Sequence, residues 1–325
     1  MTEEKYFIGV DLGGTNIKAV AMNREGKIFH QQNIPTESEK GPLPVIDKLV
    51  LLIESVRRKK DVTRRSLGAI GVAVAGAVDM KQGICRFLTN FPTKWKGIPL
   101  ASRIKERTGC TSFLINDVRA ITLAEKTFGA GRKVKNLVCI ALGTGIGGGI
   151  VIDGKLHFGS KGFAGEIGHQ TISMDGPKCG CGNYGCFEAL ASGSNIASQA
   201  IRFIKQGRST MIRDLVEGDL NRITPEVVAK AARQGDEVAR EIWEKEACYV
   251  GIGIANLVVS LDPEMVIIGG GIAKAADLLF EGIKKELSRR VYVDPDVSRL
   301  KIVKSEFGDI AGAVGAATWA MMNVF

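Results

Sequence analysis

This chain lacks long hydrophobic runs. Among its 325 residues, the longest stretches without a charged side chain are 136–152 and 310–325. Both are shorter than the roughly 20 apolar residues that a transmembrane helix needs, and both contain glycine. We therefore expect no membrane-spanning segment and no membrane partner.

The chain also lacks a secretory signal and is poor in cysteine. Its first residues, MTEE, have neither the positive charge nor the apolar stretch of a signal peptide. The 7 cysteines are an odd number, which indicates reduced thiols. In such a chain, clustered cysteines more often bind metal than form disulfides. A cytoplasmic protein is therefore expected.

Aromatic residues are scarce, at 6%, although the net charge is +9. The basic clusters at 57–60, 64–65, 284–285 and 289–290 follow apolar patterns with helical spacing, where cations complement the helix dipole. No aromatic residues alternate with them, and no DNA- or RNA-binding module is recognisable. We therefore interpret these clusters as solvated helix ends and expect no nucleic-acid partner. The basic balance still favours a polyanionic substrate such as a nucleotide.

Glycine, by contrast, is abundant, with 40 residues beside 45% hydrophobic and 24% charged residues. This composition is typical of an α/β protein with many tight turns, and the length leaves room for two domains. Periodicity and turn residues predict helices near 44–59, 99–108, 117–128, 193–206, 225–234, 236–260 and 274–290, strands at 68–75, 112–115 and 265–268, and an amphipathic C-terminal stretch at 309–323 that folds back. We expect one domain to comprise 1–117 plus about 309–325, and the other 118–308.

An internal repeat relates the two expected domains. Residues 8–28 (IGVDLGGTNIKAVAMNREGKI) and 138–156 (VCIALGTGIGGGIVIDGKL) align with Leu12 opposite Leu142. Each copy consists of a strand, a glycine turn, a second strand and a turn into a third. Two copies of one β-hairpin unit predict two related domains that face each other.

The glycine turns of the repeat are candidate phosphate sites: Gly13, Gly14 and Thr15 in the first copy, and Gly143, Thr144 and Gly145 in the second. Glycine leaves backbone N–H groups uncovered and permits positive φ angles, so such turns form anion-binding concavities. Asp11 is placed to bind Mg²⁺ through water. Ordinary hairpins use the same residues, so the duplication, more than either turn alone, favours a nucleotide.

A third glycine turn follows the predicted strand 265–268. Gly269 and Gly270 stand between that strand and the next helix. This arrangement suits the base and ribose of a nucleotide, because the start of a helix and its preceding turn expose backbone donors. Tight packing of the helix on the strand is the alternative interpretation.

Metal-binding residue types are concentrated in residues 165–188. Four of them have the ligand types of a closed tetrahedral zinc site: His169, Cys179, Cys181 and Cys186. Cys179 and Cys181 are too close in sequence to bridge each other easily. Zinc held by these four would leave Glu166 and Glu188 free to bind a polar ligand. A purely structural zinc site, with both glutamates as surface charge, is the alternative.

Asn116 and Asp117 stand at the start of the predicted helix 117–128. A carboxylate at this place can act as a general base. Asn and Asp are also ordinary helix N-caps, so the two residues alone leave both interpretations open.

Together these motifs resemble the ROK family of sugar kinases and, within it, most closely the bacterial ATP-dependent glucokinases. The resemblance covers nearly the whole chain and is carried by DLGGTNIK at 11–18, INDVRA at 115–120, ALGTGIGGG at 141–149, GEIGH at 165–169, CGCGNYGCFE at 179–188 and VIIGGGIA at 266–273. The cysteine string and its interval from the histidine are specific to this family, whereas actin and heat-shock ATPases share the glycine turns. The resemblance implies a two-domain actin-like ATPase (ribonuclease H-like) fold with a duplicated β-hairpin core, and with ATP and sugar in the cleft between the domains.

The resemblance also implies a role for each matching residue. Asp117 would be the catalytic base, which accepts a proton from a primary hydroxyl as its oxygen attacks the γ-phosphorus. The implied sugar-binding residues are Asn90, Asn116, Asp117, Glu166, His169 and Glu188. Asp11 and the turns at 13–15 and 143–145 would frame Mg-ATP. Zinc on His169 and the three cysteines would be structural, because four protein ligands leave no open position.

The chemistry of these side chains agrees with a sugar. Ionised Glu166 and Glu188 accept hydrogen bonds only, so they suit a vicinal diol and suit phosphates poorly. Zinc on one ring nitrogen of His169 would fix the other nitrogen toward a sugar hydroxyl.

We therefore expect ATP-dependent phosphorylation of a hexose, in the first place glucose to glucose 6-phosphate. The alternatives are N-acetylmannosamine, N-acetylglucosamine or fructose as acceptor, polyphosphate as donor, and a non-catalytic sugar sensor. The family's repressors carry an N-terminal helix-turn-helix, for which a first strand that begins by Tyr6 leaves no room. Beyond Asn90, the run Pro92, Thr93 and Lys94 stands where many relatives have aromatic residues. A homodimer or higher homo-oligomer is the family-level expectation.

Overall fold

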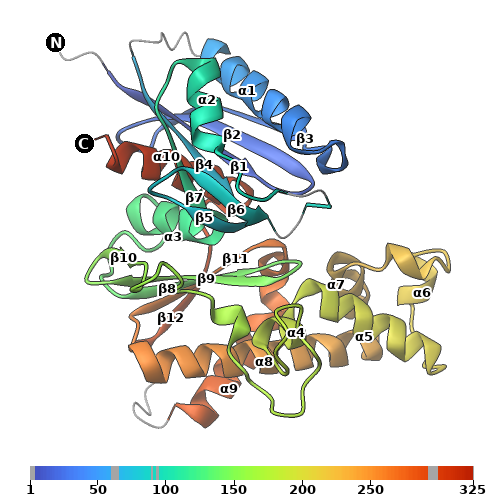
Figure 1. Ribbon diagram of the computed structural model, residues 1–325. Helices are drawn as coiled ribbons and strands as arrows, with labels where there is room; N and C mark the ends of the chain where they lie inside the picture. Colours follow the sequence, from blue (N-terminus) through green and yellow to red (C-terminus); the bar gives the residue numbers. More distant parts are fainter. Residues whose placement is uncertain (1–3, 60–65, 89–90, 93–94, 292–298, 325) are drawn as a thin grey trace. The chain divides into compact units, whose positions relative to one another are not determined.

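The structure is a computed structural model that describes residues 4–59, 66–88, 91–92, 95–291 and 299–324 (Figure 1). The chain forms two compact units. The first comprises Met1–Lys133 and Glu306–Phe325, and the second comprises Val134–Ser305. Within the described ranges, no helix combines the length and the apolar character needed to cross a membrane.

A five-stranded mixed sheet forms the centre of the first unit, in the order β3-β2-β1-β4-β7. Its strands are β1 (Tyr6–Leu12), β2 (Asn16–Asn23), β3 (Ile28–Pro35), β4 (Leu67–Val74) and β7 (Ser112–Asn116). Strands β1, β2 and β3 pair antiparallel, whereas β4 pairs in parallel with both β1 and β7. A separate hairpin of β5 (Gly76–Asp79) and β6 (Ile84–Leu88) follows β4.

Helices cover both faces of this sheet: α1 (Pro42–Lys59) and α2 (Leu100–Thr108) on one face, and α3 (Asp117–Thr127) and α10 (Ala311–Met322) on the other (Figure 1). The cause is the alternation of side chains along β1. Val10 packs in the cluster that includes α1 and α2, whereas Phe7 packs in the cluster that includes α3 and α10. Gly9 lets α10 approach the sheet, since a Cβ there would lie 1.8 Å from the Ala313 carbonyl oxygen.

The second unit repeats this plan with a sheet in the order β10-β9-β8-β11-β12. Its strands are β8 (Leu137–Leu142), β9 (Ile146–Ile152), β10 (Lys155–His157), β11 (Met265–Gly269) and β12 (Lys301–Lys304). Three strands again pair antiparallel, and β11 pairs in parallel with β8 and β12. The two sheets match strand for strand, which confirms the internal repeat.

The second unit also contains a large helical layer: η2 (Ile167–His169), α4 (Phe187–Ala191), α5 (Gly193–Lys205), α6 (Ile212–Leu215), η3 (Leu220–Arg222), α7 (Pro225–Arg233), α8 (Glu237–Leu261), η4 (Gly271–Ala275) and α9 (Ala276–Arg290). The long helix α8 begins where the Asp236 carboxylate accepts a hydrogen bond from the Ala239 N–H (2.8 Å), a typical N-cap. Its buried side chains, such as Trp243 and Ile254, share one core with α5, α7 and α9.

The units divide elsewhere than the domain boundaries expected above. A break between 117 and 118 would have separated β7 from α3, but Ala124 of α3 shares a cluster with Phe7 of the first sheet. The chain leaves the first unit after Lys133 and returns at Glu306 instead of about 309. Periodicity located α3 well, but an apolar helix face does not show which sheet it covers.

Candidate active site

In the first unit, the turn between β1 and β2 is fixed by hydrogen bonds to its carbonyl groups. The Thr36 hydroxyl donates to the Gly13 carbonyl (2.7 Å), and the Thr36 N–H donates to the Thr15 carbonyl (2.9 Å). The Gly13 N–H donates to the Asn16 carbonyl (3.1 Å). The loop that follows β3 therefore holds the first predicted phosphate turn in one shape.

Asp11 lies near the end of β1, beside the start of α10. A Cβ on Gly312 would lie only 2.7 Å from Asp11 Oδ2, so a glycine is needed for this approach. Burial raises the pKa of Asp11 to about 6, although the charge of Lys18, opposite it in β2, lowers it. An anion that burial disfavours gains stability from a divalent cation, so Asp11 fits the predicted Mg²⁺ role.

The junction of β7 and α3 resolves which of two neighbouring residues caps the helix. Asn116 Oδ1 accepts hydrogen bonds from the N–H groups of Val118 (3.1 Å) and Arg119 (3.2 Å), and Asn116 Nδ2 donates to the Gly76 carbonyl (3.3 Å). Asn116 is therefore the N-cap, and Asp117 is the first helical residue. Because Asn116 caps the helix, Asp117 is not needed for capping and is still a candidate general base. Asn116 fixes the helix start on which Asp117 lies.

In the second unit, the first residues of α5 hold the turn between β8 and β9. The Gly193 N–H donates to the Gly143 carbonyl (2.8 Å), and the Ser194 hydroxyl donates to the Thr144 carbonyl (3.1 Å). The turn itself closes with a bond from the Gly143 N–H to the Gly145 carbonyl (2.9 Å). The equivalent turns of the two units are thus both fixed through their carbonyl groups, but by different elements.

The third glycine turn lies at the same edge of the second sheet. Strands β8 and β11 run in parallel with Ala141 opposite Gly269, so both end at this edge. Gly270 has φ +85°, and a Cβ there would lie 2.2 Å from the Leu142 carbonyl oxygen. The turns at 143–145 and 269–270, both predicted to bind the nucleotide, are therefore neighbours.

The reason for glycine differs among the predicted turns. Gly270 has the positive φ angle that was expected of them, but Gly13, Gly143 and Gly145 do not. At Gly145 a Cβ would lie 2.4 Å from Glu188 Oε2, and at Gly13 a Cβ would lie 2.9 Å from the Asn16 carbonyl oxygen. Close approach, which a sequence pattern cannot distinguish from a φ requirement, explains these two.

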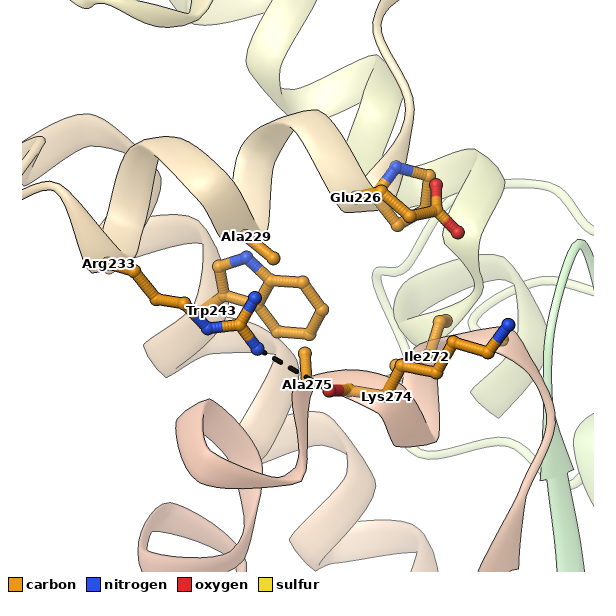
Figure 2. Close-up of a pocket in the computed structure, with 9 residues that line it drawn as sticks. Glu226, Ala229, Arg233, Trp243, Ile272, Lys274 and Ala275 are labelled. Atoms are coloured by element: carbon orange, nitrogen blue, oxygen red, sulfur yellow. Dashed lines mark hydrogen bonds between the residues drawn. The ribbon is translucent and has the colours of Figure 1, made fainter. Parts of the chain in front are cut away.

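A pocket of about 310 Å³, its open mouth included, begins beside the third glycine turn (Figure 2). It is lined by Pro225, Glu226, Ala229, Arg233, Trp243, Gly271, Ile272, Lys274 and Ala275. Figure 2 shows Arg233 and Trp243 toward one side, and Glu226 and Lys274 toward the other. Arg233 is held in place because it donates to both carboxylate oxygens of Asp277 (2.7 and 2.9 Å). No local pattern in the sequence marked Glu226, Arg233 or Trp243.

The predicted zinc ligands come together. The ligand atoms of His169, Cys179, Cys181 and Cys186 all lie within 4.8 Å of one another. Two of the separations are 3.7 Å: Cys181 Sγ to Cys186 Sγ, and Cys179 Sγ to His169 Nδ1. A tetrahedron of 2.3 Å zinc–sulfur bonds has edges of about 3.8 Å, so the donor set fits zinc. All the cysteines are free thiols in the structure, which argues against the disulfide alternative.

Two features of this cluster bear on how it would bind a metal. Burial raises the pKa of the Cys186 thiol to about 12, whereas the Asn183 backbone N–H lowers the pKa of Cys181. Zinc binds thiolates, so loading the cluster should release protons. Because Nδ1 of His169 faces Cys179, Nε2 is the ring nitrogen left for another partner.

Glu166 and His169 lie at the two ends of the short helix η2, which packs against the start of β9. A Cβ on Gly168 would lie 2.1 Å from the Ile146 carbonyl oxygen. In a 3₁₀ turn, residues three apart lie one above the other, so Glu166 and His169 lie on the same side of η2. Glu166 is exposed, so its carboxylate is accessible to a ligand.

Glu188 connects the zinc-ligand cluster to the glycine turn. Its Oε2 accepts a hydrogen bond from the Ile146 N–H (2.8 Å), and its Oε1 lies 3.9 Å from Cys179 Sγ. Glu188 was predicted to bind sugar with both oxygens, but one of them already has a backbone donor. This link was not predictable, because Ile146 and Glu188 lie in different motifs. Asn90, also predicted to contact sugar, lies outside the described residues.

Comparison with known proteins covers nearly the whole chain. The model of the ROK family matches residues 7–323. A glucokinase of Thermotoga maritima is 36% identical, with 96% of each chain covered. A ROK family glucokinase from Streptomyces griseus, solved in complex with glucose and AMPPNP, has a TM-score of 0.84 at 32% identity over 98% of this chain and 99% of that one. A xylose repressor of Caldicellulosiruptor bescii is 33% identical over 98% of this chain and 78% of the repressor. The expected actin-like ATPase fold is thereby confirmed.

Proposed function

Since the chain belongs to the ROK family, we propose that it is an ATP-dependent hexose kinase that converts glucose to glucose 6-phosphate. The observation that carries this proposal is the position of Glu188. Its Oε1 lies 3.9 Å from Sγ of Cys179, one of the candidate zinc ligands. Its Oε2 accepts a hydrogen bond from the N–H of Ile146 (2.8 Å), which directly follows the candidate phosphate turn at 143–145. A sugar-binding group and a phosphate-binding turn in direct contact suit phosphoryl transfer to a sugar.

The proposal assigns sugar recognition mainly to the second unit. Glu166, Glu188 and His169 Nε2 would bind hydroxyl groups, because carboxylates accept from adjacent hydroxyls and a neutral imidazole nitrogen can do so singly. Zinc on the four-ligand cluster would supply rigidity at His169 and no reactive water. The acceptor is proposed to be glucose because the relatives with high similarity include two glucokinases, one of them solved with glucose.

Nucleotide binding is assigned to both units. The backbone donors of the turns at 13–15 and 143–145 would take the phosphates, and Asp11 would hold Mg²⁺, which would neutralise phosphate charge. The pocket beside Gly271 would receive the base, since it combines a buried aromatic ring, Trp243, with polar side chains such as Glu226.

Asp117 is assigned the proton transfer. Its carboxylate would accept the proton of the sugar's primary hydroxyl as that oxygen attacks the γ-phosphorus, and Asn116 would fix the start of α3 beneath it. The similarity to a xylose repressor keeps a sugar sensor without transfer activity as the second candidate. The presence of an acidic residue at this first helical position favours catalysis.

The test is ADP release from Mg-ATP with glucose, mannose, fructose, N-acetylglucosamine and N-acetylmannosamine. We expect release mainly with glucose. The matched variant Asp117→Asn should lower kcat by about 10²- to 10⁴-fold, the usual contribution of a general base, and should still bind glucose by calorimetry. ADP release mainly with a different sugar would assign that sugar as the acceptor. Sugar binding without any ADP release would support the alternative function of a non-catalytic sugar sensor.

A further inference from the structure

Glu125 is a buried carboxylate that none of the proposed catalytic roles uses. It has no exposed surface, and it lies near the C-terminal end of α3, about two turns beyond Asp117. A buried charge is tolerated when strong hydrogen bonds replace its water. What its two oxygens bind is therefore informative.

The two oxygens of Glu125 bind two segments that are far apart in the sequence. Oε2 accepts a hydrogen bond from the Ala130 N–H (3.1 Å), and Oε1 accepts one from the Phe307 N–H (3.0 Å). Ala130 comes just before the chain leaves the first unit after Lys133. Phe307 comes just after the chain returns at Glu306. One side chain thus fixes the first-unit ends of both crossings.

A glycine keeps this carboxylate in place. A Cβ on Gly129 would lie 2.4 Å from Glu125 Oε2 and 3.0 Å from its Cα. Any larger residue at 129 would push the carboxylate or the outgoing segment away.

The second unit fixes its own ends of the same two crossings. Glu264 Oε1 accepts from the N–H groups of Lys135 (2.7 Å) and Asn136 (2.8 Å), and the Ser305 N–H donates to the Ile268 carbonyl (2.9 Å). On the way out, the Gly131 N–H also donates to the Glu125 backbone carbonyl (2.9 Å), and the Arg132 N–H donates to the Gly129 carbonyl (3.3 Å). The hydrogen bonds of the two units therefore come close together in sequence, at 132 and 135 on the way out and at 305 and 307 on the return. Hinges between compact units are formed by short segments of this kind.

Helix α3 is itself rigidly seated in the first unit. A Cβ on Gly315 of α10 would lie 1.7 Å from the Ala120 carbonyl oxygen, so the two helix backbones are in contact. Asp117 at one end of α3 and Glu125 near the other therefore belong to one body.

We propose that Glu125 is a positioning residue that fixes both hinge segments to the helix that carries the catalytic base. Asp117, Glu125 and the first-unit ends of both hinge segments then move as one body, which keeps the Asp117 carboxylate in one orientation on α3. This inference rests on the proposed kinase function and adds to it a residue outside the family's motifs quoted above.

The test compares Glu125→Gln with the matched control Glu306→Gln. The glutamine has one acceptor oxygen in place of two, so one backbone N–H would face an amide N–H. Glu306 lies on the returning crossing, but its carboxylate makes only an exposed ion pair with Arg132 (3.6 Å) among the contacts that the structure gives for it. We expect Glu125→Gln to lower kcat by about 10- to 100-fold through misplacement of the base, with KM for both substrates within about threefold. Glu306→Gln should leave both unchanged.

A second variant, Gly129→Ala, keeps the Glu125 carboxylate but displaces it. If Glu125→Gln does not fold, the same measurement of kcat is made on Gly129→Ala, and the same decrease is expected. If both variants lost thermal stability yet kept the kcat of the control, Glu125 would be merely structural and the proposal would be overturned. Hydrogen exchange of the Ala130 and Phe307 amides tests the anchors without activity. Equal exchange in wild type and Gly129→Ala would refute the anchoring, whereas a wild type that releases no ADP with any sugar would refute the kinase function instead.

Discussion

Replacement of Asp11 by asparagine should make the first unit more stable while it removes the kinase activity proposed here. Asp11 is partly buried near the end of β1, and the burial of its carboxylate raises its pKa from 3.8 to about 6. A raised pKa means that the folded protein prefers the neutral acid. Asparagine is close in shape to that neutral acid and stays neutral at every pH.

The size and the sign of the effect follow from linkage. A shift of about 2 units at about 1.4 kcal/mol per unit gives about 3 kcal/mol. Below pH 4, Asp11 is protonated in both states and costs nothing. As the pH rises from about 4 to about 6, the unfolded chain ionises first, so the wild type loses up to about 3 kcal/mol of stability. The stability of Asp11→Asn relative to wild type should therefore rise over this window and stay constant above it.

Urea unfolding between pH 4 and pH 7.5 measures this difference. A shared Trp243→Phe background would confine the fluorescence signal to the first unit, where Trp95 and Trp319 lie. Asp309→Asn, an exposed change beside α10, is the control and should stay within about 0.5 kcal/mol of wild type. The reasoning would be refuted if the free energy of unfolding of Asp11→Asn equalled that of wild type at pH 7, or if the difference between the two did not change with pH. Mg-ATP-dependent turnover that survives in this variant would remove Asp11 from the cation site.

Three further changes test the second unit. Cys181→Ser should lower bound zinc from about one ion per chain to none and lower the melting temperature, since structural zinc contributes folding free energy; unchanged metal content by elemental analysis would exclude Cys181 as a ligand. Glu188→Gln should raise KM for glucose by about tenfold, the loss of one charge-assisted hydrogen bond, and raise KM for ATP less. Gly145→Ala should raise both KM values, because the new Cβ would lie 2.4 Å from Glu188 Oε2; two normal KM values in steady-state assays would show that this close approach is dispensable.

Much of this architecture was predictable because its determinants are local. The 3.6-residue periodicity located α1, α3 and α8 to within about two residues, and the repeated hairpin identified the duplicated sheets. The zinc-ligand cluster was predictable because His169 and the cysteines lie within one short segment. Strand β12 was not foreseen, since four partly exposed residues with lysine at both ends show no alternation.

Contacts between distant segments were not predictable in the same way. Nothing near Glu125 in the sequence indicates Phe307, 182 residues away, and nothing near Glu188 indicates Ile146. A carboxylate can accept from any backbone N–H, so its residue type does not specify the partner. The packing of α3 against the sheet of the first unit was likewise not predictable, because an apolar helix face does not specify the sheet that it covers.

The two copies of the hairpin differ at two positions that bear on their proposed roles. When Leu12 is aligned with Leu142, Asp11 stands opposite Ala141 and Thr15 stands opposite Gly145. The first copy has a carboxylate where the second has a methyl group, so only the first can hold a cation. The second copy has a glycine where the first has a threonine, and this absence of a side chain admits Glu188 to the turn. Residue differences at two equivalent positions therefore leave one carboxylate beside the first turn and bring another to the second, where the proposed function uses them for the cation and for the sugar.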